Sequence, residues 1–167
     1  VVKGLNVVSL NYSDTHTDMM LDFSMNYNKN QIIDSIDNKY HHRSNAYKRR
    51  EEGNKGKNVQ AIEMLQRALN SGIYADYLLV DSWYAKPNFI KEVNDNGLDV
   101  ISRVAKSNKI WQFTGKHKTL QSLYESAHKT KTSKLGNYNS IKYSYVSTVT
   151  THKTLGRVKI VFIKTKE

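Results

Sequence analysis

The chain has 167 residues, enough for one sizeable core or for one core with a smaller appendage. It contains no cysteine, which excludes a disulfide framework and a thiolate metal site and fits a cytoplasmic protein. No apolar run approaches the ~20 residues that a membrane span needs, and the first residues do not resemble a signal peptide.

The charge is distributed unevenly along the chain. Residues 1–100 hold 12 Lys/Arg and 13 Asp/Glu, a net charge of −1, whereas residues 101–167 hold 14 Lys/Arg and 2 Asp/Glu, a net charge of +12. The near-neutral part can host metal chemistry, and the basic part suits a polyanion such as nucleic acid. The alternative for the basic part is a solubilising surface that has no partner.

The first elements that the pattern predicts form an antiparallel hairpin. Apolar residues mark strands at 7–12 and 19–25, and residues 13–18 between them are typical of a turn. Residues 26–57 are polar and irregular, so we expect short helical pieces or mobility there. Within them, the basic cluster at 47–50 indicates either a DNA contact or a solvated loop.

A helix, a strand, a second helix and a second strand follow in turn. Asn58 is the expected cap of the first helix, and Gly72 is its expected stop. The apolar run at 77–80 predicts a central strand covered on both faces, with Asp81 at its carboxyl end. Pro87 can begin the next helix, and a strand over 98–104 completes a βαβ unit with parallel strands.

Beyond residue 104 the pattern becomes β-rich and basic. Residues 111–113, 141–146 and 158–163 read as strands, and a short helix is expected at 120–127. We therefore predict an α/β core over residues 1–104 and a basic β-rich insertion over residues 105–167.

Asp81 is the candidate for chemistry. In α/β sheets, ligands bind at the carboxyl ends of the strands, and Mg²⁺ prefers hard oxygen ligands such as carboxylates. A carboxylate that only caps a helix or accepts a local hydrogen bond is the structural alternative.

The segment 77–87, Tyr-Leu-Leu-Val-Asp-Ser-Trp-Tyr-Ala-Lys-Pro, resembles the second-aspartate block of DDE transposases of bacterial insertion sequences. It is similar to the cut-and-paste, IS-four-like group, in which a β insertion precedes the last catalytic residue. Residues 2–23 resemble the second and third strands of the same RNase H-like domain, and residues 97–101 resemble the strand after the second aspartate. The likeness is firmest over 58–104 and implies an α/β fold, a partial RNase H-like mixed sheet flanked by helices.

This resemblance implies DNA transposition by metal-dependent strand cleavage and transfer. Three carboxylates would hold two Mg²⁺ (or Mn²⁺) ions, and Asp81 would be the second of the three. The implied partners are transposon-end and target DNA and further copies of the intact transposase, in the bacterial cytoplasm at the nucleoid.

The other two carboxylates of such a set are not found in this sequence. The first belongs on a strand that we expect upstream of Val1. The third belongs in a Tyr-x2-Arg-x3-Glu-x6-Lys pattern; Tyr47 and Arg50 match its opening, but Asn54 stands at the glutamate position. We therefore expect a piece of a longer enzyme that is inactive alone.

Other candidate ligands have ordinary explanations. Asp22 lies on a strand and either points at the active edge of the sheet or is a solvated acid, which we favour. Asp14 and Asp18 are expected turn formers. The side chains of His41 and His42 are expected to point apart, without a third ligand.

Four residues are candidates for DNA contacts. Arg103, Lys106 and Lys109 follow a strand beside the proposed active site and can contact phosphates. In hairpin-forming relatives an aromatic residue of the insertion stacks on a flipped base, and Trp111 matches it by type and region; the alternative is that Trp111 packs in the core of the insertion.

Three tyrosines in the basic segment are further candidates for contacts with bases. Tyr138, Tyr143 and Tyr145 either stack on bases or lie along one face of a strand without a partner.

Two rival functions remain. One is a non-catalytic nucleic-acid-binding module or the remnant of a decayed element. The other is a host nuclease with the same sheet, which does not predict the basic insertion.

Overall fold

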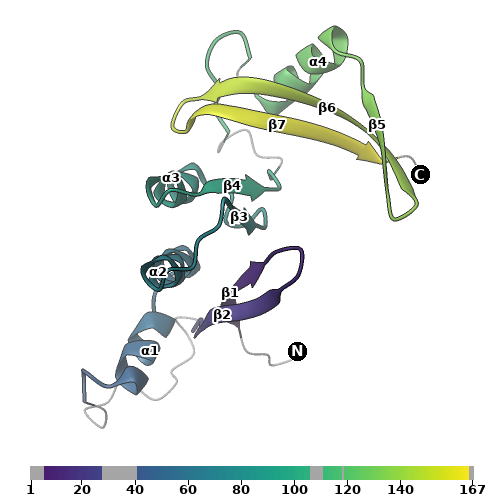
Figure 1. Cartoon of the computed structure of the whole chain (residues 1–167). Coiled ribbons are helices and arrows are strands. Elements are labelled where there is room, and N and C mark those ends of the chain that lie inside the picture. The colour runs from purple at the N-terminus through teal and green to yellow at the C-terminus, as the bar shows by residue number, and fades with distance from the viewer. Residues whose placement is uncertain (1–5, 28–40, 106–110, 118, 166–167) are drawn as a thin grey trace, which may run out of the picture. The chain divides into compact units, whose positions relative to one another are not determined.

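The computed structural model describes residues 6–27, 41–105, 111–117 and 119–165, and these form a mixed α/β structure of three small sheets and four helices (Figure 1). The chain divides into two compact units. The first is Val1–Tyr77 with Asn96–Leu98, and the second is Leu78–Asp95 with Asp99–Glu167. The predicted boundary between residues 104 and 105 stays a prediction.

The hairpin at the start of the first unit is confirmed. Strand β1 (Val7–Ser13) pairs antiparallel with β2 (Asp18–Met25), and a bulge interrupts the register between Leu10 and Asn11. Asp14 forms the turn, because its Oδ1 accepts hydrogen bonds from the backbone N–H groups of His16 and Thr17 at 2.7 and 2.6 Å. Those two bonds hold the pKa of Asp14 below its ordinary value.

Two helices cover this hairpin. Helix α1 (Asn45–Gly53) is one of the short helical pieces expected in the polar stretch, and the Ser44 hydroxyl caps it by accepting from the Tyr47 N–H at 3.2 Å. Helix α2 (Lys57–Asn70) begins two residues earlier than predicted, since Gly56 rather than Asn58 is its N-cap. Its end is as predicted, with Gly72 in the left-handed region at φ +81°.

The second unit begins with the predicted order of strand, helix and strand. Strand β3 (Tyr77–Val80) is the hydrogen-bonded neighbour of β4 (Asp99–Ser102), and α3 (Pro87–Asp95) lies between them in sequence and buries Phe89 and Val93. The expectation that β3 is covered on both faces is wrong, because Leu79 is 72% exposed. Among the described residues β3 has only β4 as a partner strand, and alternate side chains of the pair stay exposed.

The rest of the second unit is a curved antiparallel sheet with a helix on one face (Figure 1). Its strands are β5 (Lys134–Tyr138), β6 (Ile141–His152) and β7 (Gly156–Thr165), in the order β5-β6-β7. Helix α4 (Leu120–Thr130) is longer than predicted and begins with a capping box between Thr119 and Ser122. The sequence pattern did not predict β5.

A small apolar core joins this sheet to the segment that follows β3. It consists of Ala85, Trp111, Phe113, Leu123 and Ile160, all buried. The predicted strand over residues 111–113 is reduced to an isolated bridge between Phe113 and His152, and both aromatic side chains of that stretch are buried in the core. No helix in the described part of the chain is long and apolar enough to cross a membrane.

Candidate active site

Asp81 lies where the sequence placed it, directly after β3 and on the surface. Its Oδ1 accepts a hydrogen bond from the backbone N–H of Trp83 at 2.7 Å, and its own carbonyl accepts from the N–H of Tyr84 at 3.3 Å. This turn leads the chain from β3 toward α3 and restricts the rotamer of the carboxylate. The carboxylate is therefore both exposed and held in position.

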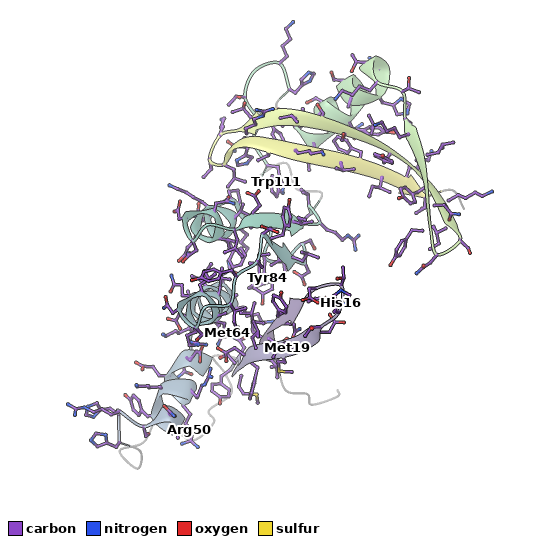
Figure 2. All side chains as sticks on the ribbon, in the orientation of Figure 1. His16, Met19, Arg50, Met64, Tyr84 and Trp111 are labelled. Carbon is purple, nitrogen blue, oxygen red and sulfur yellow. The ribbon has the colours of Figure 1, made fainter. Side chains whose placement is uncertain are left out.

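Aromatic side chains surround the turn. The Trp83 ring is 47% exposed and meets the Tyr84 ring edge-on at 5.0 Å, and Tyr84 in turn packs against Phe89 at 5.5 Å. The ammonium group of Lys86 lies 4.6 Å from the centre of the Trp83 ring. Burial, and then the negative charge of Asp81, raise the pKa of the Tyr84 hydroxyl, which Figure 2 labels.

A divalent ion needs more ligands than Asp81 supplies. The carboxylate of Asp81 has the right donor chemistry for Mg²⁺, because it is an exposed hard oxygen ligand. However, no group of three or more His, Asp or Glu side chains that could hold a metal occurs among the described residues. Asp81 thus fits one position of a metal site, and the described residues do not complete that site.

Asp22 is not a solvated acid, because its carboxylate belongs to a cluster of ion pairs. Its side chain is 12% exposed, and its Oδ1 and Oδ2 accept hydrogen bonds from Arg49 and Arg67 at 3.0 and 2.8 Å. The sequence-based expectation failed because it assigned Asp22 to solvent, whereas α1 and α2 bring two arginines over its strand. Burial raises the pKa of Asp22, but the hydrogen bonds and charges of Arg67 and Arg49 outweigh burial and leave the pKa below 3.8.

Glu52 on α1 closes the same cluster into a ring of alternating charges. Its carboxylate lies 2.7 Å from Arg67 and 3.0 Å from Arg49, and its side chain is 6% exposed. Burial lowers the pKa of Arg67, but the hydrogen bonds to Glu52 and Asp22 outweigh it and raise the pKa overall. The basic cluster at 47–50 therefore contributes at least Arg49 to internal structure.

The two adjacent histidines behave differently from the expectation. The rings of His41 and His42 stack with centroids 4.5 Å apart and planes 24° from parallel, so they do not point apart. Stacking of the flat imidazoles buries part of each ring in an otherwise polar turn. Within the described ranges no third ligand joins them.

The DNA-contact candidates have three different outcomes. Arg103 follows β4 and is exposed. Lys106 and Lys109 lie outside the described residues. Trp111, labelled in Figure 2, is 4% exposed and meets the ring of His152 edge-on at 5.5 Å, which is the packing alternative.

The sequence pattern indicated the basic segment and the tyrosines but did not predict the surface on which the last three strands gather them. Residues 126–166 contain nine Lys/Arg and no Asp/Glu, and the tyrosines of β5 and β6 lie among them. The alternation of Arg157, Val158, Lys159 and Ile160 carried the signal, since a period of two assigns the basic residues to one face. Without β5 and the register, the two sides of the sheet could not be told apart.

Comparison with models of protein families relates the chain to a described family. The model of a family described as DDE superfamily endonuclease matches residues 1–157. No curated protein and no solved structure matches the chain.

Proposed function

Because the chain belongs to the DDE superfamily endonuclease family, we propose that it takes part in DNA transposition, with Asp81 as one of the catalytic carboxylates. Endonucleases of this kind cleave DNA, and transposition adds strand transfer at transposon ends. The observation that carries the proposal is the exposed Asp81 carboxylate, held by the Trp83 N–H at the carboxyl end of β3. Ligands of α/β sheets bind at this end of a strand.

Asp81 would hold one divalent ion, Mg²⁺ or Mn²⁺, together with ligands from outside the described residues. When bound, such ions activate a water or a 3′-hydroxyl and stabilise the charge on the phosphate. Asp22 is not a suitable second ligand, because Arg49 and Arg67 occupy both of its carboxylate oxygens. We propose that the 167-residue chain alone binds DNA without cutting it.

The finer family assignment rests on the order of elements. The hairpin, helix α2, strand β3 followed by Asp81, helix α3 and strand β4 come in the order of an RNase H-like domain, with α1 as an additional helix, and a β-rich basic segment comes after them. This order supports an IS-four-like transposase with a β insertion. Self-association of the intact transposase on paired transposon ends forms part of the same proposal.

A non-catalytic nucleic-acid-binding module is the second candidate. It is favoured by the excess of positive charge in residues 101–167 and by the lack of a three-ligand metal cluster in the described part of the chain. Both functions predict DNA affinity, so binding alone does not separate them. Cleavage does.

The decisive experiment compares the chain with a protein extended by the flanking coding sequence, using an end-labelled transposon-end duplex with Mg²⁺ or Mn²⁺. We expect no cleavage by the 167-residue chain and cleavage by the extended protein. Asp81→Asn in the extended protein should abolish cleavage and leave DNA binding intact, because the change removes a metal ligand and no basic residue.

Asp76→Asn is the matched control. Asp76 is also exposed, but it precedes β3 and therefore lies at the opposite end of the same strand. The proposal fails if Asp81→Asn cleaves as well as the unchanged protein, or if both variants lose activity equally.

A further inference from the structure

The β5-β6-β7 sheet has one face in its core and one face toward solvent. Val146 and its cross-strand partner Phe162 point into the core together with Ile160, and α4 covers this inner face. Cross-strand partners share a face and neighbours along a strand alternate. Tyr145 and its partner Ile163 therefore lie on the opposite side, which we call the outer face.

Aromatic and aliphatic side chains occupy the outer face. Tyr138, Ile163 and Val161 are 70%, 64% and 46% exposed. The rings of Tyr143 and Tyr145 lie 6.2 Å apart, tilted by 43°. A Cβ at Gly136 would collide with the Tyr143 ring, so this glycine lets the ring lie against β5. Exposed apolar side chains gathered on one sheet face are typical of a binding surface.

The charges on the same face are all positive. Lys134 pairs with Tyr145, Lys159 with Val149, and Arg157 with Thr151, so these three cations belong to the outer face. The sequence from residue 126 to residue 166 contains no acid that could neutralise them. Two copies of this face would oppose like charges, which disfavours self-association through it, whereas a polyanion is complementary.

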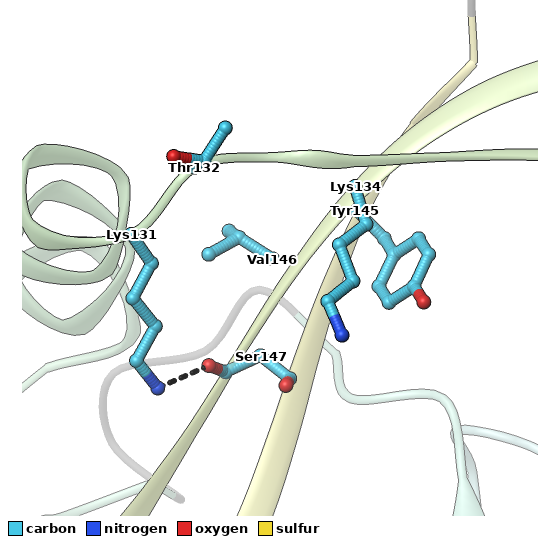
Figure 3. A pocket seen from close by; sticks show the side chains of 6 residues that line it. All are labelled: Lys131, Thr132, Lys134, Tyr145, Val146 and Ser147. Carbon is cyan, nitrogen blue, oxygen red and sulfur yellow. Dashed lines mark hydrogen bonds between the residues drawn. The ribbon is translucent and has the colours of Figure 1, made fainter.

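A groove lies along the edge of β6 next to Lys134, the first residue of β5, in the part of β6 that β5 does not pair with. It has a volume of about 370 Å³ and is lined by Lys131, Thr132, Lys134, Tyr145, Val146 and Ser147 (Figure 3). The Lys131 ammonium donates to the Ser147 carbonyl at 2.8 Å and so satisfies a carbonyl on that edge. The groove therefore adds the side chains of Lys131 and Lys134 to the positive charge near Tyr145.

We propose that the outer face of the β5-β6-β7 sheet binds single-stranded DNA, with bases stacked on Tyr138, Tyr143 and Tyr145 and phosphates at Lys134, Arg157 and Lys159. A duplex keeps its bases stacked inside and cannot cover tyrosine and isoleucine side chains, but an unpaired strand offers bases and phosphates together. The inference rests on the proposed function, in which strand cleavage at transposon ends exposes unpaired DNA.

The first test is the affinity of the 167-residue chain for a labelled oligothymidine, followed by fluorescence anisotropy over a range of salt concentrations. Arg157→Glu with Lys159→Glu should weaken binding roughly tenfold or more and flatten the salt dependence. Lys91→Glu with Lys129→Glu is the control. It makes the same change in net charge at exposed positions on α3 and α4, and it should weaken binding less than threefold. Equal losses in both pairs would overturn the proposal, since affinity would then follow net charge alone.

The second test removes a ring and keeps the position apolar. Tyr145→Leu should weaken oligothymidine binding roughly fivefold or more, because a stacking platform is lost. Tyr74→Leu changes a 74% exposed tyrosine of the first unit and should leave the affinity unchanged. Tighter binding of a duplex than of the oligothymidine would contradict the inference. So would a dimer that dissociates in Val161→Glu while DNA affinity stays the same.

The outcome is separable from that of the proposed function. Outer-face variants that lose oligothymidine binding support the inference even if no extended protein ever cleaves DNA, in which case only the proposed function fails. Cleavage that depends on Asp81, combined with unchanged oligothymidine affinity in the outer-face variants, overturns the inference and leaves the proposed function standing.

Discussion

In the first unit, two acids and two arginines face one another across β2, α1 and α2, and their formal charges cancel within the cluster. In the β5-β6-β7 sheet, Lys134, Arg157 and Lys159 stand on one face of a segment that contains no acid. The two regions thus place basic residues in opposite electrostatic surroundings.

The difference shows how burial decides what a charge does. Asp22 and Glu52 are 12% and 6% exposed, so each needs a partner to offset its desolvation, and the arginines supply it. The cations of the outer face are exposed and keep their hydration, so their desolvation cost in the folded sheet is small. They add little to the stability of the sheet and remain available to a partner. Stability experiments on both regions therefore test whether burial makes this difference.

The largest effect should come from the apolar core of the second unit. Phe113 is 2% exposed and packs edge-on against His152 at 5.6 Å, so Phe113→Ala should lower the free energy of unfolding by about 3–5 kcal/mol. Both tryptophans of the chain lie in this unit, and their fluorescence during urea unfolding measures the loss. Ile163→Ala, at a 64% exposed position, should cost no more than about 0.5 kcal/mol. Equal costs would show that the outer face is part of the core.

The same substitution in both regions tests the comparison directly. Arg67→Met leaves two poorly exposed acids with Arg49 alone and should destabilise the first unit by about 1–3 kcal/mol. This loss of stability is smaller than the loss expected for a fully buried ion pair, because the Arg67 side chain is 43% exposed. Amide hydrogen exchange of α2 would report the loss. Arg157→Met on the outer face should change stability by less than about 0.5 kcal/mol; a similar loss there would show that the sheet too depends on its charges.

The pH dependence of the first unit should depend on Asp22. Its pKa in the folded state lies below the ordinary value of 3.8, so its stabilising contribution is complete above about pH 4 and is lost as the pH falls through the folded pKa. Exchange of the α2 amides between pH 3 and pH 7 should show this loss in the unchanged chain. In Asp22→Asn the slope should be smaller, and an identical slope would exclude Asp22 as its source.

Local patterns predicted the elements that short-range chemistry determines. Turn residues and alternation predicted the hairpin, and the apolar periodicity with Gly72 predicted α2. The apolar run predicted β3 and the position of Asp81 directly after it. These features depend on interactions between residues close in sequence, so they can be read from one segment at a time.

Long-range pairing accounts for what the sequence did not reveal. Arg67 lies 45 residues from Asp22, and no local rule connects an acid on a strand with arginines on two later helices. Strand β5 contains Gly136 and Asn137 and has little strand propensity of its own; pairing with β6 decides its conformation. The exposure of Leu79 likewise follows from which strands pair in the sheet and not from the apolar run itself.

The smallest effect is expected for a single exposed ion pair in the first unit. Lys55 and Glu63 lie 2.6 Å apart, but their side chains are 38% and 30% exposed, and neither belongs to the ring formed by Arg49 and Arg67. Lys55→Met should therefore cost no more than about 1 kcal/mol in α2 hydrogen exchange, and moderate salt should remove most of the difference. The loss of stability in Arg67→Met should persist in the same salt, because Asp22 and Glu52, the acids that Arg67 pairs with, are shielded from solvent. A contrary result would be a loss of stability in Lys55→Met as large and as resistant to salt as the loss in Arg67→Met. Burial would then not be what distinguishes structural charges from charges available to a partner. The comparison between the two regions would lose its physical basis.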